Sequence, residues 1–68
     1  MKQYRFVGMK RKMLGEYVTE DETERSHRNV VVEMAGQGWR FINYIPVDMD
    51  GYGKLKRYDL VFEKDTDE

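Results

Sequence analysis

The chain has 68 residues, with no cysteine, one histidine, and 12 basic against 13 acidic residues. This composition excludes disulfides, zinc–thiolate sites and a multi-histidine metal site within one chain. It also provides no net positive field that would attract nucleic acid or an anionic membrane. A single domain of this length buries only roughly 60% of its unfolded surface. Small domains often gain stability from disulfides, metals or oligomerisation, and oligomerisation is the one of these that the composition leaves readily available.

We expect no targeting or membrane signal in this sequence. No apolar run approaches the roughly 18 residues that cross a bilayer, and the N-terminal segment MKQYRFVGMKRK has no apolar stretch before a small-residue cleavage site. We therefore expect a cytoplasmic protein with no membrane partner and no cofactor. The charge pattern predicts one α+β domain over residues 1–63 and a disordered acidic tail over residues 64–68.

The first element is predicted to be a strand over residues 2–9. Tyr4 and Phe6 alternate with charged or smaller residues, as on the two faces of a strand. Gly8 indicates either a bulge or the close approach of another element. The next segment, residues 10–18, leaves two interpretations open: an extension of the strand, or a loop hinged at Gly15.

A helix is predicted over residues 20–36. Thr19 and Glu22 have the spacing of a capping box, and the residues between them suit the positive end of a helix. The three valines at 30–32 leave a strand as the alternative interpretation. Gly36 and Gly38 then indicate the helix end, because glycine adopts the left-handed conformation that closes a helix without a Cβ clash.

Two further strands are predicted to form an antiparallel hairpin. Residues 39–46 change to a period of two, and Pro46 either ends the pairing or lies on an edge. Two aspartates and two glycines within residues 48–53 are typical of a turn. Residues 54–63 alternate again and supply the final strand.

The predicted fold is α+β, a two-layer β-α-β-β arrangement with one helix packed on one face of a small, mostly antiparallel three-stranded sheet. One helix covers one face only, and regular alternation would leave apolar side chains of residues 39–46 on the other. Exposed apolar patches mark interaction surfaces, so we predict a homodimer. The predicted self-association surface consists of Val7, Arg40, Ile42 and Tyr44.

The junction between helix and hairpin resembles a known family. The chain has the pattern of a helix followed by Gly-x-Gly-Trp and an alternating strand, here Met34–Ile42, within a longer match that starts at Asn29. This pattern is similar to that of small bacterial proteins grouped as a domain of unknown function, built from a strand, a helix and a hairpin. Arg40 replaces a usual acidic residue, and Ala35 a frequent glycine. The resemblance implies a fold and no activity.

Two sequence patterns resemble metal sites. Glu24 and His27 have the E-x-x-H spacing of di-iron helical bundles, which need further carboxylates from other helices. Asp48 and Asp50, with Gly53 and Asp59, resemble a calcium loop, but their flanks are predicted to be strands. A solvated helix face and a turn are the preferred interpretations, so no metal ligand and no catalytic residue is assigned.

Two short basic runs are candidates for nucleic-acid contacts if they converge near aromatic residues. The alternative is that they keep strand ends soluble. The residues concerned are Lys10, Arg11, Lys12, Lys54, Lys56 and Arg57.

The resulting hypothesis is a non-enzymatic, homo-oligomeric binding or regulatory module that associates through its uncovered sheet face. A weak nucleic-acid-binding module is one alternative. A small enzyme or metal-binding protein, with a site formed only in the oligomer, is the other.

Overall fold

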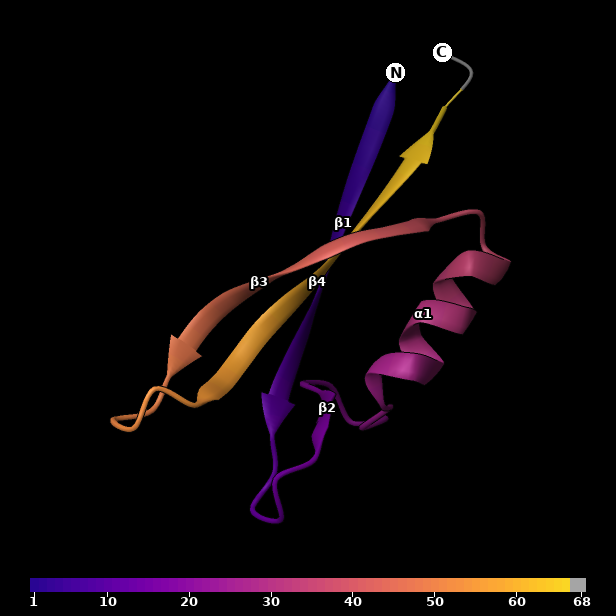
Figure 1. The fold of residues 1–68 in the computed structure, drawn as a ribbon. Helices are drawn as coiled ribbons and strands as arrows, with labels where there is room; N and C mark the ends of the chain where they lie inside the picture. Colours follow the sequence, from indigo (N-terminus) through magenta and orange to yellow (C-terminus); the bar gives the residue numbers. More distant parts are fainter. Residues whose placement is uncertain (67–68) are drawn as a thin grey trace.

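The computed structural model describes residues 1–66, which form four strands and one helix (Figure 1). The four strands make one sheet in the order β2-β1-β4-β3, and every neighbouring pair is antiparallel. In chain order the elements are β1 (Lys2–Arg11), β2 (Tyr17–Thr19), α1 (His27–Gly36), β3 (Arg40–Met49) and β4 (Leu55–Asp65).

The predicted three-stranded, two-layer fold is wrong, because the sheet has a fourth strand, β2, beside β1. The chain reverses after β1: the Lys12 N–H donates to the Glu16 carbonyl at 2.7 Å, and Gly15 has a φ of 93°. Residues 10–18 therefore hold both a strand extension and a turn, followed by the start of β2. Three residues are too few to show an alternating pattern, so the sequence does not reveal β2.

The helix begins seven residues later than predicted, at His27 instead of residue 20. Ser26 is its N-cap: the backbone is extended there, and the hydroxyl accepts the N–H of Asn29 at 3.3 Å. This is the ordinary way in which serine satisfies a donor at the start of a helix. The valines at 30–32 lie within α1, so the strand alternative for them is excluded.

A tight turn replaces the expected first half of the helix. Thr19 lies in β2 and donates its hydroxyl to Asp21 Oδ1 at 2.7 Å, while the same oxygen accepts from the Thr23 N–H and hydroxyl. The Arg25 N–H in turn donates to the Thr19 hydroxyl at 3.0 Å. Glu24 has a φ of 47°, which no helix residue adopts. Asp21, rather than a helix backbone, is therefore the partner of Thr19.

The helix end is confirmed where the glycines indicated it. Gly38 has a φ of 89° and donates its N–H to the Ala35 carbonyl at 3.0 Å. The Trp39 N–H donates to the Met34 carbonyl at 2.9 Å. These two bonds form a Schellman motif, which closes the last turn and directs the chain into β3.

The β3–β4 hairpin is confirmed, and β3 is an edge strand, in keeping with Pro46. Its register shifts between Phe41 and Asn43, so Ile42 has no partner on β4. A second shift lies between Pro46 and Asp48. Such β-bulges place two residues opposite one and change the alternation of faces. Tyr44 consequently shares a face with Phe41, against the prediction.

One face of the sheet carries the core with α1. The buried apolar side chains of this cluster are Met9, Val30, Met34, Trp39, Tyr58, Leu60 and Phe62. Figure 1 shows α1 on one side of the crossing strands, between β2 and the start of β3. No second helix within residues 1–66 covers the opposite face, which we call the helix-free face.

β4 extends to Asp65, two residues beyond the predicted domain boundary at 63. Thr66 donates its N–H to the Met1 carbonyl at 2.9 Å. The remainder of the predicted tail, residues 67–68, lies outside the described residues. Within the described part of the chain, no helix has the length and apolar character needed to cross a membrane.

Candidate functional site

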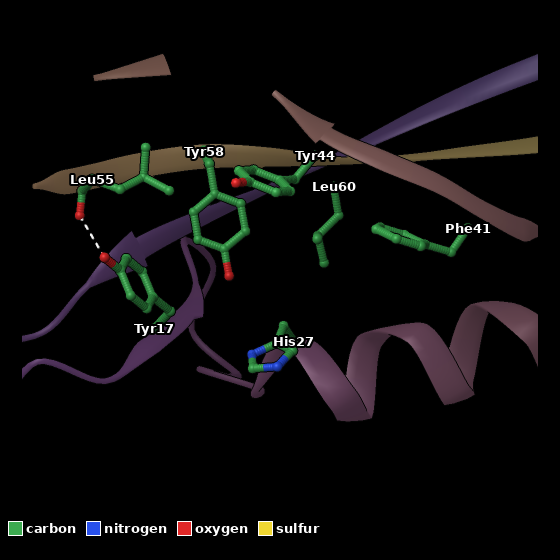
Figure 2. Close-up of a pocket in the computed structure, with 7 residues that line it drawn as sticks. All are labelled: Tyr17, His27, Phe41, Tyr44, Leu55, Tyr58 and Leu60. Carbon is green, nitrogen blue, oxygen red and sulfur yellow. Dashed lines mark hydrogen bonds between the residues drawn. The ribbon is translucent and has the colours of Figure 1, made fainter. Parts of the chain in front are cut away.

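An open, mostly apolar cleft of about 310 Å³ lies beside the start of α1, on the same side of the sheet as the core (Figure 2). Four elements contribute to its walls: β2, α1, β3 and β4. The lining residues are Tyr17, His27, Phe41, Tyr44, Leu55, Tyr58 and Leu60.

Three tyrosines form a row along the cleft. The Tyr58 ring contacts Tyr17 and Tyr44 edge-on, with centroid distances of 5.2 and 5.7 Å. The Tyr17 hydroxyl donates to the Leu55 carbonyl at 2.7 Å, which holds β2 against the start of β4. Burial raises the pKa of the Tyr58 hydroxyl, and the neighbouring tyrosines add to the rise. Tyr58 is therefore a neutral hydrogen-bond donor at physiological pH.

His27 lies at the rim of the cleft, as the first residue of α1. Its side chain faces the cleft in Figure 2 and is solvent-exposed. The predicted E-x-x-H pair does not lie on a helix, because Glu24 precedes α1 and pairs with Lys12 at 3.2 Å. Glu24 and His27 are thus not arranged as helical metal ligands.

The helix-free face carries a strip of apolar side chains across three strands. Phe6 on β1 and Asn43 on β3 both lie opposite Val61 of the central strand β4. Tyr4 and Phe6 are each 57% exposed and Ile45 is 48% exposed, whereas Val61 is 8% exposed. The long side chains of the neighbouring strands β1 and β3 therefore flank the buried Val61 of β4 and remain open to solvent themselves.

Three cations on this face are paired with carboxylates of the same chain. Lys2 lies 3.1 Å from Asp65 and 3.7 Å from Glu63, and Arg40 contacts the same Glu63. Arg57 lies 3.7 Å from Glu20. The helix-free face thus combines an exposed apolar strip with locally balanced charges.

The four residues predicted for self-association do not share one face. Val7 and Tyr44 lie opposite Leu60 from either side, which places both on the face that carries α1. Arg40 lies opposite Glu63 on the helix-free face, and Ile42 is the unpaired bulge residue. The bulge explains the error for Tyr44, because an extra residue shifts the alternation by one.

The six basic candidates gather near one end of the sheet. Lys10 lies opposite Arg57, which joins the two runs. Carboxylates pair with three of the six: Arg11 bonds Asp50 at 2.9 Å, Lys12 bonds Glu24, and Arg57 contacts Glu20 and Asp48. The remaining three are Lys10, Lys54 and Lys56. Acidic neighbours therefore offset much of the positive charge at this end.

The aspartates of the calcium-like pattern have structural partners. Asp50 Oδ1 accepts the N–H groups of Tyr52 and Lys54 at 2.9 and 3.0 Å, which is an ordinary turn arrangement. Its other oxygen accepts from Arg11, and this bond, with the N–H groups of Tyr52 and Lys54, lowers the pKa of Asp50 to about 2. Among residues 1–66, no cluster of three or more histidine, aspartate or glutamate side chains could hold a metal ion.

A family model described as a domain of unknown function (DUF4177) matches residues 2–65. The chain belongs to this family. No curated protein and no solved structure matched the chain.

The DUF4177 match confirms the family expected from the Gly-x-Gly-Trp junction, and its description assigns no activity. The cleft was missed by sequence reasoning. Tyr17, Tyr44 and Tyr58 are far apart in the chain, and only β2 and the bulge in β3 bring them together. The available signal was the high number of tyrosines, five in 68 residues.

Proposed function

We propose that this DUF4177 domain is a non-enzymatic module that binds a second copy of itself through the helix-free face. The observation that supports this proposal is the exposed apolar strip of Tyr4, Phe6 and Ile45 around the buried Val61. Contiguous apolar patches that face solvent are typical of protein–protein contacts. Two further residues of the edge strand, Ile42 and Val47, are also about half exposed at the bulges of β3.

The surface area of the chain favours association. The chain exposes 5170 Å², whereas a compact monomer of 8.2 kDa is expected to expose about 4500 Å². A standard interface takes about 800 Å² from each partner, which is about 15% of the exposed area. A second copy would thus cover apolar surface that the chain's own core leaves open.

The paired charges favour a second copy over a charged partner. Lys2, Arg40 and Arg57 on the helix-free face each already have a carboxylate neighbour. Two identical faces can therefore meet without net repulsion, and a strongly acidic or basic partner gains little. The nucleic-acid alternative has less support, because carboxylates pair with Arg11, Lys12 and Arg57.

The contact is proposed to involve side chains rather than the addition of a strand to β3. The Tyr44 N–H donates to the side chain of Asn43 at 2.8 Å, so this backbone donor of the edge strand already has an acceptor. Pro46 lacks an N–H, and the bulges interrupt the regular spacing of the strand. Such devices are typical of edges that avoid pairing with another chain.

The test is the oligomeric state of the wild-type chain and the variant Phe6→Lys/Ile45→Lys, measured by sedimentation velocity between 5 and 200 μM. We expect the wild type to dimerise, and each lysine to weaken association by about tenfold or more, because a buried ammonium would lack a partner. Val32→Lys is the matched control, since Val32 is 71% exposed on α1. A wild-type monomer at 200 μM, or a double variant that associates like the wild type, would refute the proposal.

A further inference from the structure

We propose that the cleft beside α1 binds a small planar aromatic molecule that carries one hydrogen-bond acceptor, and that the Tyr58 hydroxyl donates to this acceptor. The cleft has a volume of about 310 Å³, which is at the lower end of the roughly 300–1,000 Å³ of ligand pockets. This inference goes beyond self-association and rests on the other face of the sheet.

The Tyr58 hydroxyl is the polar feature that points to a ligand. The side chain is 8% exposed, and its ring is held edge-on between Tyr17 and Tyr44. Figure 2 shows the hydroxyl directed into the cleft, and no residue of the described chain forms a hydrogen bond with it. By contrast, the Tyr17 hydroxyl already bonds the Leu55 carbonyl. Tyr58 thus presents a donor from an otherwise apolar wall.

The shape and charge of the walls define the class of ligand. The rings of Phe41, Tyr44 and Tyr58 offer faces and edges to an aromatic group, and such pairs add to the energy of simple burial. The cleft is lined by no carboxylate, lysine or arginine of the described chain. A nucleotide or sugar phosphate would therefore lack a counter-charge. A neutral aromatic ketone, aldehyde or ester fits the walls and the single donor.

His27 closes the rim of the cleft at the start of α1. Its imidazole faces the cleft in Figure 2 and reaches solvent, so it offers the ligand a second polar contact at the mouth. The Tyr58 donor and the polar rim lie on different elements, β4 and α1, with apolar walls between them. This arrangement is typical of pockets that orient a small molecule with few polar groups.

The experiment compares two probes that differ only in the acceptor, acetophenone and ethylbenzene. Each is titrated into ¹⁵N-labelled protein, and binding is followed by chemical-shift changes. We expect saturable shifts around Tyr58, Leu60 and His27, and binding of acetophenone roughly fivefold tighter than that of ethylbenzene, as one hydrogen bond provides. Tyr58→Phe should remove this preference and leave ethylbenzene binding unchanged. Tyr4→Phe, which removes a hydroxyl from the helix-free face, is the matched control.

Two further variants keep the test decisive. Phe41→Trp enlarges a partly exposed residue in the wall of the cleft and should block binding of both probes. This variant tests the location of the site if Tyr58→Phe does not fold. Phe6→Lys/Ile45→Lys should bind acetophenone like the wild type, which separates this site from self-association. The proposal is overturned if neither probe saturates at millimolar concentration, if Tyr58→Phe keeps the preference, or if the probes bind only by dissociating a dimer.

Discussion

β4 and β3 are neighbours in the sheet and have similar residue types, yet they differ sharply in burial. On β4, Leu60 and Phe62 are 4% and 0% exposed, whereas Tyr44 and Ile45 on β3 are 50% and 48% exposed. β4 has a strand on each side, and β3 has a strand on one side only. Position in the sheet, more than hydrophobicity, therefore decides which aromatic residues form the core of this domain.

The difference has a consequence for function. Leu60 and Phe62 of β4 are fixed in the core, whereas Tyr58 of the same strand contributes its hydroxyl to the cleft. Both candidate surfaces meet at β3, which contributes Ile45 to the helix-free face and Phe41 and Tyr44 to the cleft. The edge strand thus contributes exposed side chains to both candidate surfaces.

The largest effect is expected from Phe62→Ala. The Phe62 side chain is fully buried and contacts Phe41 edge-on at 5.8 Å. Its removal should lower the free energy of unfolding by about 3–5 kcal/mol, which is most of the stability of a domain of this size. Phe41→Ala, which removes the exposed partner of the same pair, should cost about 1 kcal/mol. Urea unfolding followed by circular dichroism measures both, and equal losses would contradict the contrast between β4 and β3.

The next largest effect is expected at the junction that leads α1 into β3. Gly38→Ala should lower the free energy of unfolding by about 1–2 kcal/mol, because its φ of 89° is strained for alanine. Gly36→Ala is the matched control. Gly36 is helical and has no atom within 4 Å of an added Cβ, so this change should stabilise by about 0.4–1 kcal/mol. Thermal unfolding of the pair should give opposite signs; the same sign for both would show that the junction is not held as described.

The smallest effect is expected at the other end of β3, where Asp50 joins the hairpin turn to Arg11. The bond to Arg11, together with the N–H groups of Tyr52 and Lys54, lowers the pKa of Asp50 from 3.8 to about 2 in the folded chain. A depressed pKa contributes stability above the unfolded value of 3.8, and this contribution is lost as the pH falls from about 4 to about 2. Asp50→Asn keeps an acceptor for the turn but should flatten the change in melting temperature over this range. An unchanged pH profile would show that the Asp50 carboxylate adds no stability over this range.

The sequence predicted those elements whose signals are local. The helix end follows from Gly38, and the β3–β4 hairpin follows from the turn chemistry around Asp50 and Gly53. The helix start was wrong because Thr19 and Glu22 fit a capping box, but Asp21 accepts the hydroxyl of Thr19 instead. Two local preferences competed there, and the choice depended on the pairing of β2 with β1.

The candidate surfaces depend on features that no local pattern shows. The helix-free face was predicted to contain Tyr44, but the extra residue at Ile42 moves that side chain to the cleft. The position of Phe6 beside Val61 depends on the strand order, which the sequence leaves open. The cleft needs β2 as one wall, and three residues without periodicity do not predict a strand.

The bulge at Ile42 also affects how related chains are compared. Phe41 pairs with Phe62 of β4, and Tyr44 pairs with Leu60. Phe41 and Tyr44 are three residues apart on β3, whereas Phe62 and Leu60 are two residues apart on β4. A relative that lacks one residue between these positions would keep both rings on the same face. A one-residue gap at Ile42 in a sequence alignment is therefore consistent with an unchanged architecture. The cleft residue that corresponds to Tyr44 in such a relative is then the one placed after the gap.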